Sequence, residues 1–218
     1  MFAGHVGAAL ALGRAERRVN AGFLVLAAIL LDLVLWVLVL AGWESVTIPP
    51  DYSKTHQPQF DFPYSHGLVA SIAWSVLAGA AAFVCAGNAR MRAATIVAAA
   101  VLSHWLLDAL VHSPEMPLAD DASPRVGFGL WNAMPVALAV ESAIAAAGLA
   151  LFLQGARLSR AKKIGLAAAV LVVLLFTIVG MTVAPPPPSA FAMAASSIVT
   201  IAVVCALAAW FSRSGVNG

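Results

Sequence analysis

The chain has 218 residues, of which 62% are hydrophobic and only 10% are charged, and its formal net charge is +2. A soluble globular domain carries about 25% charged and about 45–50% apolar residues. The composition therefore excludes a disordered chain, a nucleic-acid-binding domain and a soluble enzyme, and it predicts a polytopic membrane protein. We expect the two cysteines, which lie inside apolar runs, to be core residues rather than a disulfide or a zinc knuckle.

The first apolar segment, residues 2–13, is too short to cross a membrane. Its helix would cover roughly 18 Å, about half of the hydrocarbon core. The segment has neither the basic region nor the small-residue cleavage site of a signal peptide. We therefore expect a retained half-helix that is re-entrant or packed among the other helices.

Six further segments have the roughly 20 mostly apolar residues that a membrane-spanning helix needs. They cover residues 20–42, 65–87, 92–111, 131–154, 164–184 and 189–211. Four consecutive prolines at 185–188 separate the last two segments, because proline cannot continue a helix. The sequence thus predicts an all-α fold with one integral membrane domain over residues 1–218. This domain is a transmembrane helical bundle of six full spans and an N-terminal half-helix.

The basic residues predict how this bundle is oriented. If the spans alternate in direction, ten of the twelve Lys and Arg residues fall on one side of the membrane. These ten are Arg14, Arg17, Arg18, Arg90, Arg92, Arg157, Arg160, Lys162, Lys163 and Arg213. Because short cytoplasmic loops are enriched in Lys and Arg, we expect this side, and with it both terminal regions, to be cytoplasmic.

Several ionisable residues lie inside the apolar segments or at their outer ends. Such side chains are costly in lipid, so each is a candidate functional residue. In chain order they are His5, Asp32, His66, His104, Asp108, His112 and Glu141. With the predicted orientation and a rise of about 1.5 Å per residue, all of them reach the middle or the outer half of the membrane.

The spacing of His104, Asp108 and His112 places them on one face of a helix, one turn apart. An imidazole and a carboxylate in this arrangement suit a hard or borderline divalent cation. Together with His5, Asp32 and His66 they would suffice for one catalytic metal with an open position, or for two metals.

Structural roles for the same residues compete with this interpretation. A buried His–Asp pair is often only a hydrogen bond between helices, and His112 precedes a Ser-Pro pair and suits a helix C-cap. Glu141 is either a partner of the ligands, a proton-relay group or an acid bonded to Ser103. We expect His56, which lies in a polar loop, to be solvated.

Aromatic side chains are concentrated in the first outer loop, residues 43–64. They are Trp43, Tyr52, Phe60, Phe62 and Tyr64. Aromatic residues at this level usually form an interfacial belt. The alternative is a lining for an amphiphilic substrate.

Five short elements carry a resemblance to a known family. They are Gly4-His5, Leu30-Leu31-Asp32, Tyr64-Ser65-His66, the segment LSHWLLD at 102–108 and the proline-containing turn at 113–118. In this order the chain resembles the membrane-bound metal-dependent hydrolase family, of the LexA-regulated bacterial inner-membrane type, over roughly residues 1–120. The family's usual D-x-D-H cluster is reduced to Asp32-Leu33-Val34-Leu35, and its H-R-G-x-T-H-S to Tyr64-Ser65-His66.

The resemblance implies metal-assisted hydrolysis in a bacterial inner membrane, with Zn²⁺, or else Mn²⁺ or Fe²⁺, as the cofactor. The predicted ligand pool is His5, Asp32, His66, His104, Asp108 and His112, with Asp108 or Glu141 as the catalytic base. We expect an amphiphilic or lipid-like small-molecule substrate, reached from the outer side, with membrane lipids and no nucleic acid as partners. The alternatives are a proton or metal-ion transporter and a non-catalytic protein with a structural metal. The apolar inner halves of the spans favour a one-sided site over a conduit.

Overall fold

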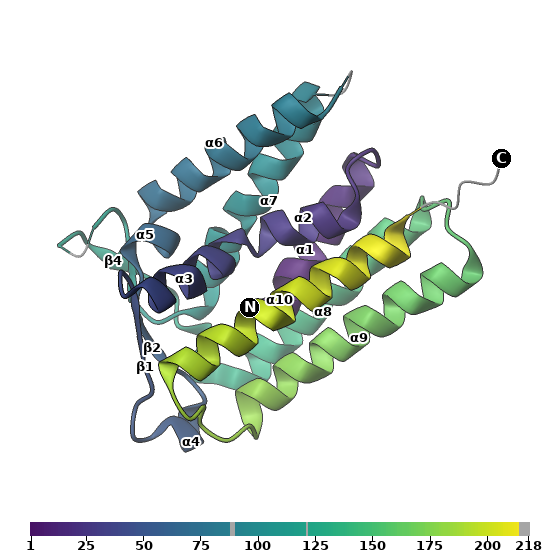
Figure 1. Ribbon diagram of the computed structural model, residues 1–218. Coiled ribbons are helices and arrows are strands. Elements are labelled where there is room, and N and C mark those ends of the chain that lie inside the picture. Colours follow the sequence, from purple (N-terminus) through teal and green to yellow (C-terminus); the bar gives the residue numbers. More distant parts are fainter. Residues whose placement is uncertain (88–89, 121, 214–218) are drawn as a thin grey trace.

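The computed structural model describes residues 1–87, 90–120 and 122–213, and helices dominate it (Figure 1). Five of its helical segments are long and apolar enough to cross a membrane. They are α6 (Leu68–Cys85), α7 (Arg90–Val111), η1 (Leu130–Ala133) with α8 (Met134–Gln154), α9 (Arg160–Thr182) and α10 (Ala190–Ser212). The prediction of an all-α membrane bundle is thereby confirmed.

The segment predicted as the first full span is broken into two helices. α2 (Ala21–Ala28) and α3 (Leu30–Ala41) meet at Ile29 with a bend of 56°, and only when taken together do they make a sixth span. Neither proline nor glycine stands at the break. The break places Asp32 in the first turn of α3, inside the bundle.

The short helix α1 (Phe2–Ala15) lies among the other helices, as expected of a packed half-helix (Figure 1). It approaches α8 very closely at two glycines, since a Cβ built on Gly148 would lie 1.9 Å from the carbonyl oxygen of Gly7. Small residues allow such close contact between membrane helices. The contact fixes the depth of α1, and with it the position of His5.

Two short antiparallel hairpins, which the sequence did not predict, shape the outer loops. β1 (Ser45–Thr47) pairs with β2 (Gln59–Asp61), and β3 (Met116–Pro117) pairs with β4 (Arg125–Val126). The helical turn α4 (Tyr52–Thr55) lies between β1 and β2, and α5 (Pro63–His66) leads from β2 into the bundle. Figure 1 shows β1, β2 and α4 at the same end of the bundle.

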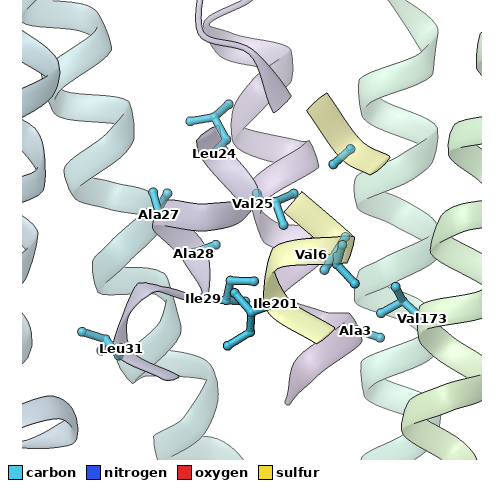
Figure 2. Packing of buried hydrophobic residues seen from close by; sticks show 14 of the residues in the cluster. Ala3, Val6, Leu24, Val25, Ala27, Ala28, Ile29, Leu31, Val173 and Ile201 are labelled. Atoms are coloured by element: carbon cyan, nitrogen blue, oxygen red, sulfur yellow. The ribbon is translucent and has the colours of Figure 1, made fainter. Parts of the chain in front are cut away.

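The apolar core surrounds the broken span (Figure 2). Val25 and Ile29 from α2 and the break lie near Val6 of α1 and Ile201 of α10, and all four are at most 3% exposed. Large apolar side chains on the outside of the bundle are exposed instead, as expected for a surface that faces lipid. Among them are Val76 on α6, Phe176 on α9 and Val199 on α10.

Candidate metal centre

Four of the six predicted metal ligands come together between α3, α5 and α7. Asp32, His66, His104 and Asp108 each offer one nitrogen or oxygen atom, and these atoms lie within 4.8 Å of one another. We call these four residues the quartet. The elements that carry them are far apart in the sequence, so tertiary packing assembles the site.

The distances within the quartet suit a single small cation. The Nε2 atoms of His66 and His104 are 3.1 Å apart, and Asp108 Oδ2 lies 3.5 and 3.1 Å from them. Asp32 Oδ1 lies 3.7 Å from both nitrogens. Tetrahedral zinc with bonds of about 2.0–2.1 Å places its ligand atoms about 3.4 Å apart. Two imidazoles and two carboxylates with this spacing therefore fit a zinc-like ion.

Each imidazole of the quartet is oriented by a second hydrogen bond on its other nitrogen. His104 Nδ1 donates to the carbonyl oxygen of Ala28 over 2.7 Å, and His66 Nδ1 is hydrogen-bonded to the hydroxyl of Ser65 at 2.8 Å. Because a carbonyl only accepts, the proton of neutral His104 is on Nδ1, and its Nε2 lone pair faces the quartet. Partners of this kind fix the orientation of metal-binding histidines and raise their basicity.

The short helix α5, which carries His66, is held in place from two sides. Glu44 Oε1 accepts hydrogen bonds from the backbone N–H groups of Tyr64 and Ser65, both at 2.8 Å. Trp105 on α7 donates from Nε1 to the carbonyl oxygen of His66. Burial raises the pKa of the Glu44 carboxyl above its ordinary value. The sequence did not predict the role of Glu44, which lies in a loop about 20 residues before His66, and it placed Ser65 beside His66 without indicating the hydrogen bond between them.

His5 lies beside the quartet and contacts Asp108 from the other side. Its Nε2 is 3.1 Å from Asp108 Oδ1, and its ring stacks on that of His104 with centroids 3.8 Å apart. The amino group of Met1 also lies 3.1 Å from Asp108 Oδ1. Both oxygens of Asp108 are thus engaged, and this residue is the centre of the buried polar network.

The remaining predicted ligand, His112, follows the last residue of α7 and lies outside the quartet. Its Nδ1 is 2.5 Å from Glu115 Oε1, while its Nε2 is 3.8 Å from Asp108 Oδ2. The position at the end of the helix agrees with the alternative of a C-cap. The contact with Asp108 nevertheless makes His112 a neighbour of the site.

Glu141 is buried on α8, and its Oε1 accepts a hydrogen bond from the backbone N–H of Gly4 at 3.1 Å. The hydroxyl of Ser103, the alternative partner considered from the sequence, donates instead to Ala100 within its own helix. Glu141 thereby joins α8 to the first turn of α1, next to His5.

The prediction that His56 is solvated is wrong, because only 8% of this residue is exposed. His56 ends α4 in a left-handed backbone conformation, with φ of 53°. This turn directs the chain back over the bundle and brings the imidazole beside the ring of Tyr52, with centroids 5.8 Å apart. The polar sequence of this loop does not indicate that the β1–β2 hairpin folds over the bundle and brings His56 to the cavity beside Asp32.

A cavity of about 390 Å³ lies next to the quartet. Asp32 and Glu141 line it together with residues of the loop 43–64, of the second half of α9 and of the first half of α10. The side chain of Asp32 is 23% exposed, whereas those of His66, His104 and Asp108 are at most 3% exposed. The quartet is therefore accessible from the side of Asp32, which faces this cavity.

Aromatic side chains from several parts of the chain line the cavity. Those that come from α3, the loop of residues 43–64 and η1 are Trp36, Tyr52, Phe60 and Trp131, and Phe2 of α1 and Phe176 of α9 line it as well. Two of the five loop aromatics thus belong to a lining. Trp43 and Tyr64, in contrast, are 72% and 57% exposed, as the alternative of an interfacial belt predicts.

Comparison of the chain with protein-family models, with curated proteins and with solved structures gave no match. The functional interpretation therefore depends on the site itself.

Proposed function

We propose that this protein is a metal-dependent hydrolase that cleaves a lipid-like or amphiphilic substrate within the membrane. One observation carries the proposal. Three side chains of the quartet are buried, and the fourth, Asp32, faces a cavity of about 390 Å³. Structural metal sites are closed by protein ligands, whereas catalytic sites keep one position accessible. The resemblance to membrane-bound metal-dependent hydrolases supports the same assignment.

The cavity favours a substrate with an apolar body and an uncharged reacting group. Its walls combine aromatic rings with aliphatic residues such as Met181 and Ile201. Among the described residues that line it there are two carboxylates, Asp32 and Glu141, and neither Lys nor Arg. Apart from the ion and the amino group of Met1, which contacts Asp108, a phosphodiester would find no cation among these described residues, so we favour an ester or an amide.

The residues of the site have separate roles in this proposal. His66, His104 and Asp108 hold the ion, and Asp32 lies at the open side, where a substrate arrives. When bound, a zinc-like ion supplies an activated water and polarises a carbonyl group. Glu141, which lines the same cavity, is the candidate general base; Asp108 is less suited to that role because both of its oxygens are engaged.

An ion conduit is the competing function, and the packing disfavours it. A conduit requires polar groups from one face of the membrane to the other. On α1 and α2, Val6, Leu10, Leu24 and Val25 are at most 3% exposed and fill the interior with apolar side chains.

We place the chain in the inner membrane of a bacterium, with both terminal regions in the cytoplasm. The ten basic residues on one predicted side and the family resemblance support this orientation. The hairpin β1–β2 and the cavity beneath it then face the outer side.

The test is hydrolysis of a panel of amphiphilic esters and amides by the purified, zinc-loaded protein, with proton and metal flux measured on the same preparation in liposomes. We expect Glu141→Gln to lower hydrolysis at least 10²-fold while keeping the metal content, because the amide oxygen still accepts from Gly4. Ser142→Ala, which removes a hydroxyl bonded within α8, is the control and should retain activity. Flux without hydrolysis would contradict the proposal, and so would metal-loaded protein with neither activity.

A further inference from the structure

A second cavity lies at the opposite end of the bundle and is strongly basic. It has a volume of about 770 Å³ and is formed where α1 ends, α2 begins and α8 and α10 end. In Figure 1 this is the end of the bundle near the label C. Four arginines line it, namely Arg17, Arg18, Arg157 and Arg213.

Arg17 is held in a defined position in this basic cavity. Its Nη2 donates to the carbonyl oxygen of Phe152 at 2.9 Å, and its guanidinium carbon lies 5.0 Å from the centre of the Phe152 ring. Burial, followed by the nearby charge of Arg14, lowers the pKa of Arg17. The guanidinium of Arg17 thus lies against α8 at the wall of the basic cavity.

Carboxylates do not neutralise the basic cavity. Among the described residues that line it there is neither Asp nor Glu. Glu16, the acid closest in sequence, is buried, and its Oε2 lies 3.5 Å from Arg92 while its Oε1 accepts from the backbone of Arg18. Arginine forms paired hydrogen bonds with phosphate oxygens, so this group of arginines suits a phosphate-bearing ligand.

Apolar side chains lie next to the arginines in the same cavity. Val19, Ala21, Phe152 and Leu158 contribute to its wall, at the level where spanning helices leave the membrane. A free phosphate ion would make no use of such a wall, whereas the glycerol and first acyl carbons of a lipid would cover it. Basic pockets between transmembrane helices bind anionic headgroups in this way.

We propose that the basic cavity is a binding site for the headgroup of an anionic phospholipid. Its phosphate lies among Arg18, Arg157 and Arg213, with Arg17 at the edge that contacts α8. The site is separate from the quartet and does not depend on the proposed hydrolysis.

The test is binding of short-chain dioctanoyl phosphatidylglycerol to the purified protein in mild detergent, measured by native mass spectrometry and by a fluorescence titration. The double variant Arg18→Gln/Arg157→Gln removes two charges from the basic cavity and leaves Arg17, which also holds the end of α8, in place. Arg90→Gln/Arg160→Gln removes the same charge from the same end of the protein but outside the cavity.

We expect the first double variant to bind the lipid at least 10-fold more weakly, and the second to bind within about twofold of the wild type. Dioctanoyl phosphatidylcholine should not compete, and millimolar inorganic phosphate should not displace the lipid. If both double variants lost lipid affinity to the same extent, the proposal would be overturned, because the lipid would then be attracted by the positive charge of the whole surface. Displacement by inorganic phosphate at the concentration of the lipid would overturn the assignment to a lipid. Unchanged thermal unfolding in each variant ensures that the comparison concerns folded protein.

Discussion

The Nδ1 of His104 donates a hydrogen bond to the backbone carbonyl of Ala28 over 2.7 Å. Ala28 is the last residue of α2, directly before the break at Ile29. In a continuous helix this carbonyl would accept from a residue one turn later in the same chain. The break in the span and the orientation of the His104 imidazole toward the quartet therefore share one hydrogen bond. The break also directs Asp32, at the start of α3, to the same point.

We predict that the purified protein binds about one zinc or similar divalent ion per chain, and that His104→Ala loses most of it. Removing this imidazole takes away one of four converging atoms and leaves His66 as the only imidazole of the quartet between Asp32 and Asp108. Metal content is measured by elemental mass spectrometry after loosely bound ions have been removed.

His56→Asn is the matched control for metal content. Asparagine tolerates the left-handed conformation of this position, and His56 is not part of the quartet. This variant should keep its metal, although activity can change because His56 lines the cavity. The same metal content in His104→Ala as in the wild type would end the interpretation of the quartet as a metal site.

Ser65→Ala tests the support of His66. Without the hydroxyl, the Nδ1 of His66 loses its partner at 2.8 Å, and the ring is no longer held with Nε2 toward the quartet. Loss of such a partner typically costs about 10–100-fold in metal affinity, and a competition titration with a zinc chelator measures it. Ser75→Ala, which removes another buried hydroxyl of the neighbouring helix α6, should leave the affinity unchanged. An equal loss in both variants would indicate a general effect on folding.

Gly148→Ala is expected to destabilise the protein, because its Cβ would collide with the backbone of Gly7. Overpacking of this kind typically costs about 1–3 kcal/mol, and here it also displaces α1 and therefore His5. Gly180→Ala is the matched control on α9, where a Cβ meets nothing within 4 Å. Thermal unfolding in detergent should fall for the first variant and stay the same or rise slightly for the second. Equal unfolding temperatures would show that α1 and α8 are not in close contact.

The positions of the spanning helices could be predicted because hydrophobic length alone determines them. Four of the six residues predicted as ligands do converge, since ionisable residues such as His104 and Asp108 are conspicuous in an apolar run. The break at Ile29 could not be predicted, because its sequence neighbours are ordinary helix formers and the side chain that hydrogen-bonds the carbonyl before it, His104, lies on another helix. The burial of His56 was missed for a related reason: two three-residue strands, too short to have a sequence signature, fold its loop over the bundle.

The orientation of the bundle is the last prediction, and it decides from which side a substrate reaches the quartet. The basic cavity and the quartet lie at different ends of the protein, and positive residues are concentrated at the cytoplasmic ends of spans. We expect alkaline phosphatase fused after Arg213 to be inactive, because its disulfides do not form in the reducing cytoplasm. The same reporter fused within residues 51–59, in the segment that carries α4, should be active. The opposite pattern would place the cavity beside Asp32 on the cytoplasmic side, and the substrate would then have to come from the inner leaflet.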